Sequence, residues 1–398
     1  MATFKNNAAI YDSVKHYYGK VLESTKDLKT SACSPSSAPH PIVKDIIRQI
    51  PHQVIEKFYG CGNPIPMGIE GKRVLDLGSG SGRDCYIAAA LVGTSGSVIG
   101  IDMTDEQIKT ARDNITKYAE VLGYKPNMKF LVGYIEFLRE AGIEKESVDL
   151  CISNCVLNLS PNKELVLRGV YDALAVGGEM YFSDIYADRR LPNEIRAHPV
   201  LLGECIGGAL YVEDFRRLCQ KIGFVEPREV NSFRVDVHEA DLLALVGDAK
   251  FYSITYRLFK LPALVELEDR EENYGQTAIY LGTIKGHEDE YVLDYQNSFI
   301  MGQRTPISGN TAVILTSSWL QNHFKVLGDR DQHHGLFYKD AKSLSTRTSV
   351  AAFDCCNASN IPTEKPNCLL SVVDTQTAKL SGCCGNAGAG SSSFRNRC

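Results

Sequence analysis

Short apolar runs alternate with amphipathic stretches between residues 72 and 185. The apolar runs, which predict strands, are RVLDLG (73–78), SVIGID (97–102), MKFLVGYI (128–135), VDLCISN (148–154) and EMYFSDI (179–185). Helical spacing is found in two stretches, 85–92 between the first and second strands and 106–123 between the second and third. Such an alternation is typical of a parallel sheet with helices on both faces. We therefore predict an α/β fold whose main domain spans residues 71–230.

The segments on either side of this alternation have different patterns. Residues 1–70 contain two helical patterns around a loop-like stretch, and residues 212–223 form one more amphipathic helix. After residue 230, the segments 276–284, 290–301 and 311–319 alternate like antiparallel strands. We expect an N-terminal helical segment over 1–70, a smaller C-terminal α+β domain over 231–345, and a disordered tail rich in Cys, Ser and Gly over 346–398.

Composition narrows the classes of function. The chain has 398 residues and a formal net charge of −5, whereas a nucleic-acid-binding protein usually carries an excess of basic residues. No apolar run approaches the roughly 18 residues that a membrane helix needs, and the first residues lack the apolar core of a signal peptide. We therefore expect a cytoplasmic protein that binds neither nucleic acid nor membranes. In that compartment its 13 cysteines are small core residues, metal ligands or reactive thiols, and we expect Cys85, Cys151 and Cys219 in the core.

A glycine-rich turn, DLGSGSG (76–82), follows the first predicted strand. Gly78 and Gly80 would let the backbone pass close to a ligand. Asp102 comes 22 residues after Gly80, at the end of the next strand, where a carboxylate can bind ribose hydroxyls. A dinucleotide site would need a third glycine at position 83, which is occupied by arginine. Asp76, just before the turn, suits a cationic ligand better than a pyrophosphate.

The segment DLGSGSG resembles the first motif of class I methyltransferases, which bind S-adenosylmethionine. The resemblance implies a Rossmann-like sheet with the methyl donor at the carboxyl ends of its strands. It places Ile135 and Glu136 beside the adenine, Met103 next to the ribose-binding Asp102, and Asn154 toward the methionine part. Dinucleotide binding, and a turn without any ligand, are the alternatives.

Three cysteines stand beside small residues or at a strand end, where we expect their sulfur atoms to be accessible. Cys155 follows the fourth strand, Cys61 lies in YGCGNPIP and Cys205 lies in GECIGGALY, whereas no histidine is an obvious general base. Thiolates prefer soft metals and metalloids. A trivalent arsenic atom takes three thiolates in a pyramid, with its lone pair directed outward. A methyl sulfonium that faces this lone pair can transfer its methyl group in line without a base, and the alignment supplies most of the acceleration.

The chain as a whole resembles eukaryotic arsenite methyltransferases. The matching segments are YYGKVL, YGCG, LDLGSGSGRDCY, IDMT, GYIE, SNCVLNL, GGEMYFSD, GECIGGALY, TYRLFK and CCG, and they extend from Tyr17 to Cys384. The resemblance implies methyl transfer from S-adenosylmethionine to arsenite and methylarsenite, which gives mono- and dimethylated arsenicals and detoxifies arsenic. It also implies a thiol reductant, glutathione or thioredoxin, and we expect a monomer.

By the same resemblance, four cysteines are functional. Cys155 and Cys205 hold arsenic through all steps, whereas Cys33 and Cys61 join for inorganic arsenite and can form a disulfide that the reductant opens. Cys61, Cys155 and Cys205 are thus the arsenic(III) ligands that we expect. Tyr59, in YGCG, is placed near the sulfonium methyl group.

Two other functions fit part of the sequence. A class I methyltransferase of a small organic molecule would share the glycine turn, but it leaves Cys61, Cys155 and Cys205 unexplained. A thiol-rich protein that sequesters metals without turnover would need neither DLGSGSG nor Asp102.

Overall fold

The computed structural model describes residues 10–15, 17, 29–32, 38–56, 60–265 and 267–338. Cys33, Tyr59 and the predicted tail at 346–398 lie outside these residues. Within the described part of the chain, no helix is long and apolar enough to cross a membrane.

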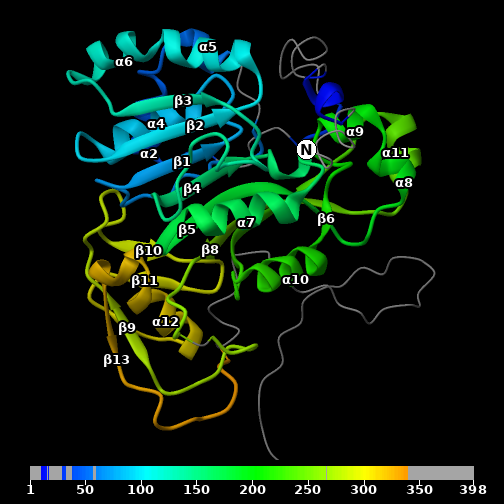
Figure 1. Cartoon of the computed structure of the whole chain (residues 1–398). Coiled ribbons are helices and arrows are strands. Elements are labelled where there is room, and N and C mark those ends of the chain that lie inside the picture. The colour runs from blue at the N-terminus through cyan, green and yellow to red at the C-terminus, as the bar shows by residue number, and fades with distance from the viewer. Residues whose placement is uncertain are drawn as a thin grey trace, which may run out of the picture. The chain divides into compact units, whose positions relative to one another are not determined.

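An eight-stranded sheet forms the centre of the fold, in the order β3-β2-β1-β4-β5-β8-β7, with β6 paired to β5 (Figure 1). The strands are β1 (Arg73–Leu77), β2 (Ser97–Asp102), β3 (Met128–Val132), β4 (Val148–Asn154), β5 (Leu174–Ala187), β6 (Leu210–Tyr211), β7 (Arg228–Val235) and β8 (Phe251–Phe259). Strands β1 to β5 pair in parallel, whereas β8 is antiparallel to both β5 and β7. The parallel sheet predicted from the five apolar runs is therefore confirmed.

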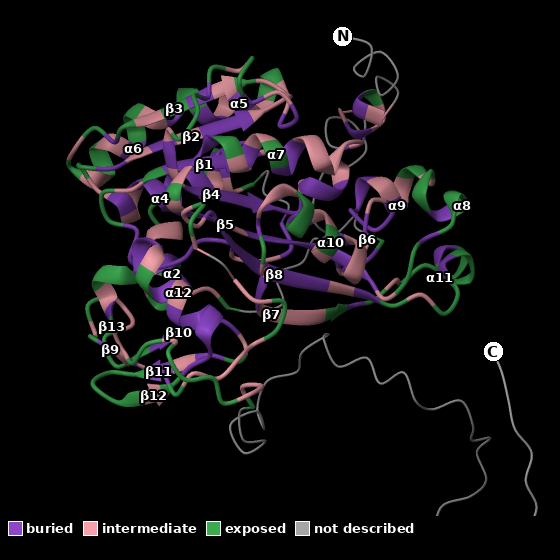
Figure 2. Ribbon diagram, turned by 60° about the horizontal axis from the view of Figure 1, so that its bottom comes forward, coloured by how far each residue is buried: buried purple, intermediate pink, exposed green. Residues whose placement is uncertain are grey.

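Helices cover both faces of this sheet (Figure 2). One face packs against α2 (Pro41–Ile47), α4 (Arg83–Val92), α5 (Asp105–Asp113) and α6 (Ile115–Leu122), and the other against α7 (Lys163–Ala173) and α10 (Val212–Ile222). Because both faces are covered, the central strands are apolar along most of their length instead of alternating. Cys85, Cys151 and Cys219 are fully buried in these two cores, as predicted.

Short helices gather around a third, smaller apolar core. They are η3 (Leu157–Leu159), α8 (Asn193–Arg196), α9 (Pro199–Gly203) and α11 (Ala240–Val246), whereas α3 (His52–Ile55) packs in the first of the two larger cores. Residues of α8, α9 and α11 pack in the smaller core together with Cys61, Cys155 and Cys205. The three cysteines thus belong to a buried layer beside the main sheet.

The C-terminal part contains two small sheets and a helix. Strands β10 (Glu290–Val292) and β11 (Ser298–Ile300) form a hairpin, and β9 (Thr277–Tyr280) lies between β12 (Arg304–Pro306) and β13 (Phe324–Leu327). A strand is therefore confirmed within 276–284, whereas 290–301, expected as one strand, forms the two strands of the hairpin. The strand predicted at 311–319 is wrong, because this segment forms α12 (Gly309–Ser317) and the start of η4 (Trp319–His323). Ser308 caps α12, and most of the helix is buried, so its apolar run does not distinguish helix from strand.

The main sheet continues past residue 230, the expected end of the main domain, because that position falls inside β7. Arg257 on β8 is fully buried and binds the carboxylate of Glu179 on β5 with two hydrogen bonds of 2.9 and 3.1 Å. The same guanidinium donates to the hydroxyl of Tyr291 on β10 at 2.6 Å. This network joins the main sheet to the C-terminal part.

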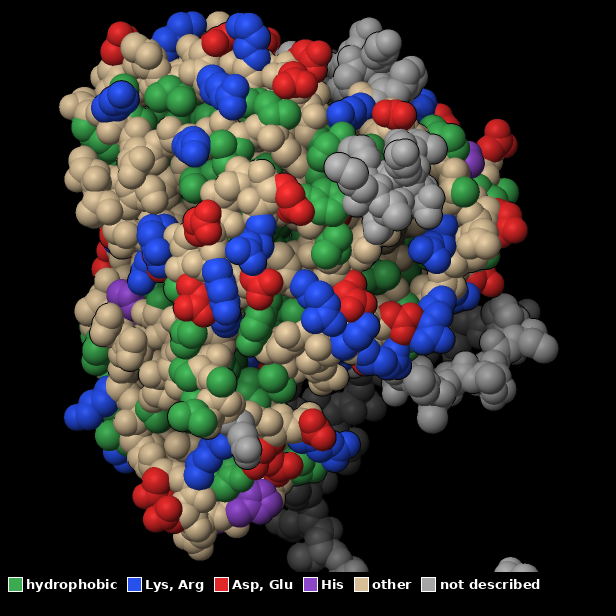
Figure 3. Space-filling view, viewed as in Figure 1, with side chains coloured by type: hydrophobic (Ala, Val, Ile, Leu, Met, Phe, Trp, Pro, Cys, Tyr) green, Lys and Arg blue, Asp and Glu red, His purple; other side chains and the backbone are tan. Residues whose placement is uncertain are grey.

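The surface carries charges of both signs. On the face shown in Figure 3, Lys and Arg side chains are interspersed with Asp and Glu side chains. Exposed ion pairs such as Arg190–Asp214 at 2.6 Å and Lys221–Glu164 at 2.8 Å contribute to this mixture. A mixed surface of this kind agrees with the small net charge of −5.

Candidate functional site

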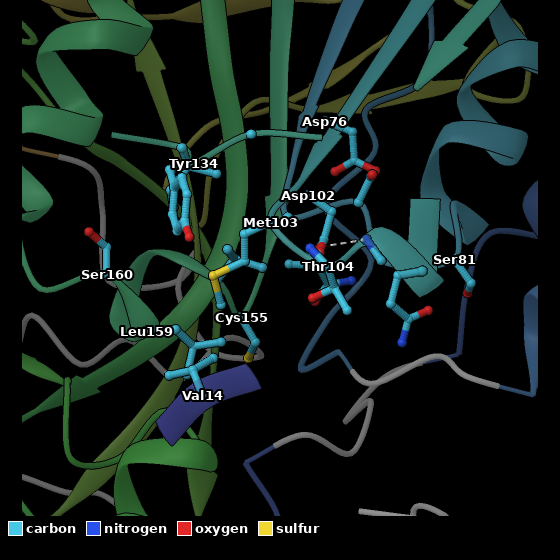
Figure 4. Close-up of a pocket in the computed structure, with 18 of the residues that line it drawn as sticks. Val14, Asp76, Ser81, Asp102, Met103, Thr104, Tyr134, Cys155, Leu159 and Ser160 are labelled. Atoms are coloured by element: carbon cyan, nitrogen blue, oxygen red, sulfur yellow. Dashed lines mark hydrogen bonds between the residues drawn. The ribbon is translucent and has the colours of Figure 1, made fainter. Parts of the chain in front are cut away.

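A pocket opens at the carboxyl ends of β1, β2 and β4, and we call it the strand-end pocket (Figure 4). It is lined by Tyr11, Val14, Asp76, Gly78, Ser79, Gly80, Ser81, Arg83, Asp84, Asp102, Met103, Thr104, Gln107, Gly133, Tyr134, Ile135, Glu136, Asn154, Cys155, Val156, Leu159 and Ser160. This set brings together eight residues that the sequence predicts around the cofactor, namely Asp76, Gly78, Gly80, Asp102, Met103, Ile135, Glu136 and Asn154. Tyr59, the ninth, lies outside the described residues.

The glycine turn brings the backbone close to the pocket. Gly78 has φ +63°, and a Cβ atom there would lie 2.4 Å from a methyl group of Val156. Gly80 has φ +53° and donates its N–H to Asp102 at 3.0 Å. The other carboxylate oxygen of Asp102 accepts the N–H of Thr104 at 2.8 Å. Burial raises the pKa of Asp102, and these two N–H bonds oppose the rise while fixing the orientation of the carboxylate.

Among the described residues that line the pocket, Asp76, Asp84, Asp102 and Glu136 are acidic, whereas Arg83 is the basic one. Asp76 is buried and accepts a hydrogen bond of 3.1 Å from the thiol of Cys85. Burial, and to a lesser extent the neighbouring Asp84, raises the pKa of Asp76 well above its ordinary value. Arg83 lies 2.7 Å from Asp84 and offsets part of this negative charge. A cationic ligand would be stabilised here, because its positive charge would favour the ionised form of Asp76, which burial alone disfavours.

Asn154 connects the pocket to the loop that carries Cys61. Its side-chain oxygen accepts the N–H groups of Cys61 at 3.0 Å and Gly62 at 3.2 Å. Its amide nitrogen donates to Asp84 at 3.0 Å and to the carbonyl oxygen of Gly62 at 3.1 Å. All polar atoms of this side chain are therefore engaged, and they hold the Cys61 loop against the end of β4.

Three predicted thiols meet beside the pocket. Cys61 and Cys155 are joined by a disulfide with a Cα–Cα distance of 5.8 Å, and the thiol of Cys205 donates to the carbonyl oxygen of Cys155 at 2.9 Å. All three residues are at most 2% exposed. Our expectation that small neighbours leave their sulfur atoms accessible is therefore wrong. Cys155 and Cys205 have φ angles of +57° and +63°, which non-glycine residues rarely adopt and which are often found at functional sites.

The disulfide differs from the pairing that the family resemblance implies. That pairing joins Cys33 to Cys61, whereas the structure joins Cys61 to Cys155. The reason lies in the backbone, because Asn154 binds the N–H of Cys61 and is followed directly by Cys155. The two sulfur atoms therefore face each other.

Glu204, which the sequence did not single out, holds the segment that precedes Cys33. Its fully buried carboxylate accepts a hydrogen bond of 2.5 Å from the hydroxyl of Thr30. The carbonyl oxygen of Ala32, at the end of the described segment 29–32, lies 3.9 Å from the sulfur of Cys155. The segment 29–32 therefore reaches the thiol cluster. Cys33, the next residue in the sequence, lies outside the described residues.

Asp184 and Lys163 set the electrostatics around the thiols, and the sequence reasoning missed both. Carboxylate and sulfur atoms of Asp184, Cys155 and Cys205 lie within 4.8 Å of one another. Burial raises the pKa of Asp184 to about 7, against the N–H bonds that its carboxylate accepts. Burial also lowers the pKa of Lys163 to about 8, and the charge of Asp184 opposes that change. Asp184 ends the segment GGEMYFSD, but nothing in that segment indicates that its carboxylate lies beside the thiols, and Lys163 lies in no segment that the sequence singles out.

Comparison with known proteins adds independent findings. Residues 69–223 match a family model described as a methyltransferase domain, and residues 273–390 match one described as an arsenite methyltransferase C-terminal domain. The arsenite methyltransferase of Aquipseudomonas alcaligenes is 47% identical over 350 residues, which cover 87% of this chain and 100% of that protein. The arsenite methyltransferase of Mus musculus is 43% identical over 320 residues, which cover 80% of this chain and 84% of that protein.

A solved structure has the same architecture. The crystal structure of CrArsM, an arsenic(III) S-adenosylmethionine methyltransferase from Chlamydomonas reinhardtii, aligns with a TM-score of 0.72 and 54% sequence identity. The alignment covers 76% of this chain and 100% of that one. The predicted class I methyltransferase fold is thereby confirmed.

Proposed function

The chain belongs to the arsenite methyltransferase family, and from this premise we propose that Cys61, Cys155 and Cys205 bind trivalent arsenic as thiolates next to the methyl donor. The protein is an S-adenosylmethionine-dependent methyltransferase. The observation that carries the proposal is that the three cysteines converge and that one of them, Cys155, also lines the strand-end pocket.

The residues of the pocket are suited to S-adenosylmethionine, which supplies an electrophilic methyl group when it is bound. Its sulfonium and ammonium groups are cationic, and the carboxylates of Asp76 and Asp102 line the pocket. We propose that Asp102 binds the ribose hydroxyls, and that Met103, Ile135 and Glu136 surround the ribose and adenine. The turn at Gly78 and Gly80 would take the backbone past the methionine part, near Asn154 and Tyr59.

Thiolate ligation explains how this site can work without a general base. None of the described residues that line the strand-end pocket is a histidine. Arsenic bound by three thiolates keeps a lone pair on its open side, and this pair can form the bond to the methyl carbon. The sulfonium sulfur then leaves as a neutral thioether, so no proton needs to move. Holding the two reactants in line is worth roughly 10⁵–10⁸ M in effective molarity for well-oriented systems.

An electron count supports the need for a thiol reductant. Transfer of a methyl cation uses the arsenic lone pair and leaves arsenic formally pentavalent. Two electrons restore the trivalent state, and two thiols can supply them by forming a disulfide, whether these thiols belong to cysteines or to the external reductant. A Cys61–Cys155 disulfide would then be an oxidised form of the site after arsenic has left it. A thiol reductant, glutathione or thioredoxin, would return it to the two thiols.

We further propose that the enzyme adds two methyl groups in turn and acts as a monomer. Arsenite has three positions for sulfur and needs three thiols, whereas methylarsenite has two. Cys155 and Cys205 would serve both substrates, Cys61 would supply the third thiol for arsenite, and Cys33 would join Cys61 in that step.

Arsenic speciation after incubation with arsenite, S-adenosylmethionine and glutathione tests the proposed function. We expect mono- and dimethylated arsenicals together with stoichiometric S-adenosylhomocysteine. Formation of S-adenosylhomocysteine on a small organic acceptor, without any methylated arsenic, would contradict the proposal.

A further inference from the structure

Where the C-terminal part meets the main sheet, one buried guanidinium contacts three carboxylates. Arg228, the first residue of β7, lies 2.7 Å from Glu226 through one terminal nitrogen. Its other terminal nitrogen lies 2.7 Å from Glu271 and 3.3 Å from Asp294. Glu226 stands in the loop between α10 and β7, whereas Glu271 precedes β9 and Asp294 lies between β10 and β11. These four residues, which we call the Arg228 cluster, therefore join the main sheet to the C-terminal part.

The charges of the Arg228 cluster do not balance. With all three carboxyl groups ionised, it would carry three negative charges and one positive charge. Asp294 has donors in its own turn, because the N–H groups of Gln296 and Asn297 bind its oxygens at 2.7 to 2.9 Å. The excess of negative charge therefore falls on Glu226 and Glu271, whose side chains are each 23% exposed. Two like charges that are close together and largely shielded from water disfavour the ionisation of both groups.

A proton held between these two glutamates removes the repulsion. The side chains of Glu226 and Glu271 lie within hydrogen-bonding reach of each other, and a bond between two carboxyl groups requires one proton. In the described part of the chain, no N–H or O–H group donates to the buried oxygen Oε2 of Glu271. Burial raises the pKa of Glu226 to about 7, while Arg228 opposes this rise and Glu271 adds to it. The pair therefore exchanges its proton close to neutral pH.

A second buried arginine at the same joint is balanced. Arg257 on β8 binds one carboxylate, that of Glu179, with two hydrogen bonds, and it also donates to the hydroxyl of Tyr291. One positive and one negative charge cancel, so this contact needs no additional proton. Near neutral pH, the joint should therefore respond through the Arg228 cluster.

We propose that the Arg228 cluster makes the attachment of the C-terminal part proton-dependent, because a proton shared by Glu226 and Glu271 holds the two parts together and its loss loosens the joint. The repulsion acts across the joint, since Glu226 is carried by the chain that enters β7 and Glu271 by the segment before β9. Asp294 and Thr311, to which Arg228 also donates, belong to the C-terminal part and would separate from Arg228 with it.

The direction of the pH dependence follows from the protonation of Glu226. Its pKa is raised from 4.5 to about 7 while the two parts are joined, and it should return toward its ordinary value when the C-terminal part opens. The stabilisation is complete below about pH 4.5 and is lost as pH rises through about 7. Between pH 6 and pH 8, this linkage should make opening of the C-terminal part about tenfold more favourable.

Amide hydrogen exchange of the full-length protein measures this opening. Peptides from β10, β11 and α12 are compared with peptides from β1 at pH 6 and pH 8, after correction for the pH dependence of the intrinsic exchange rate. We expect the opening constant of the C-terminal elements, relative to that of β1, to increase about tenfold between the two pH values. A relative opening constant that is equal at both pH values would overturn the proposal.

Two glutamine substitutions assign the effect to the pair of glutamates. In Glu271→Gln the side-chain amide can donate to Glu226 at any pH, so the increase should fall to within about twofold. Glu226→Gln should have the same effect through an amide that donates to Glu271, and it serves if the first variant does not fold. Circular dichroism verifies folding. A tenfold increase that persists in both folded variants would contradict a shared proton.

His333→Gln is the control. His333 forms an ion pair of 3.1 Å with Glu272 in the same part of the chain, and histidine is the residue type that ordinarily changes charge in this pH range. Because His333 is exposed, its ion pair should contribute little, and the tenfold increase should remain. Loss of the increase in His333→Gln, but not in Glu271→Gln, would overturn the proposal. The residues of the Arg228 cluster do not line the strand-end pocket, so these outcomes are independent of methyl transfer.

Discussion

The side-chain oxygen of Asn154 accepts the backbone N–H of Cys61 at 3.0 Å. This bond fixes a loop from the N-terminal region against the strand end that carries Cys155, 94 residues away in the sequence from Cys61. One amide side chain thus connects the pocket of the methyl donor to the thiol cluster.

Asn154→Ala should destabilise the protein and slow the formation of the disulfide. The substitution leaves the N–H groups of Cys61 and Gly62 without their acceptor, and each unsatisfied buried group costs about 1–3 kcal/mol. Urea denaturation and thiol counting after oxidation measure the two effects. Asn162→Ala is the matched control, since Asn162 only caps α7 by accepting the N–H of Leu165. It should cost about 1 kcal/mol, and a similar rate of disulfide formation in both variants would contradict the role of Asn154.

Asp102→Ala should weaken the binding of S-adenosylmethionine. A hydrogen bond to a charged group is worth about 1.5–3 kcal/mol, which corresponds to roughly ten- to a hundred-fold in affinity. Calorimetric titration measures this loss. Asp105→Ala, three residues further on in the exposed first turn of α5, should change the affinity by less than about twofold. Equal affinities of wild type and Asp102→Ala would remove Asp102 from the cofactor site.

Serine substitutions should separate the roles of the cysteines under reducing conditions. Serine keeps the size of the side chain, but its oxygen is a hard and poor ligand for arsenic. Cys155→Ser and Cys205→Ser should each abolish methylation of both arsenite and methylarsenite. Cys33→Ser and Cys61→Ser should block the first methylation and spare the second, because two thiols still hold methylarsenite. Chromatography of the arsenic species after single-substrate incubations gives the answer.

Cys219→Ser is the control for this series, because Cys219 is buried in α10 away from the thiol cluster. It should retain both activities in protein that circular dichroism shows to be folded. Full activity of Cys155→Ser on methylarsenite would move the arsenic site elsewhere. Equal loss of both activities in folded Cys61→Ser would contradict the division of labour.

Asp184 should make stability fall as pH rises. Burial raises its pKa from 3.8 to about 7 in the folded protein. Between these values the folded state holds a proton that the unfolded chain has released, so the free energy of unfolding decreases with rising pH and levels off above about pH 7. Asp184→Asn removes this titration. The free energy of unfolding of the wild type minus that of the variant should therefore be larger at about pH 5 than at about pH 8.

Urea denaturation at the two pH values checks this sign, with Asp214→Asn as control. Arg190 lowers the pKa of Asp214, so that carboxylate stays ionised throughout the range and its substitution should cost the same at both pH values. A difference for Asp184→Asn that did not change with pH would mean that Asp184 is ionised in the folded protein.

The sequence was most informative where local pattern and function coincide. The apolar runs predicted β1 to β5, because strands covered on both faces are continuously apolar. The sequence also placed the turn at Gly78 and Gly80 and the carboxylate of Asp102 at the ends of neighbouring strands, and these residues line one pocket. Eight of the nine predicted cofactor residues line one pocket, while Tyr59 stays a prediction.

Features that depend on distant contacts were out of reach. The apolar run at 311–319 has no polar break that would separate a buried helix from a strand, so α12 was missed. Cys61 and Cys155 are 94 residues apart, and contacts between distant segments, such as the hydrogen bonds of Asn154, bring them together. The pKa of Asp184 depends on burial under segments that no nearby motif announces.

The antiparallel strand β8 has a practical consequence for anyone who shortens this protein. A chain cut at residue 230 would lose β8 and most of β7, and it would expose the whole backbone edge of β5 from Glu179 to Ala187. A long, apolar and unpaired edge recruits further strands, so the fragment should aggregate. A cut after Phe259 would keep that edge paired.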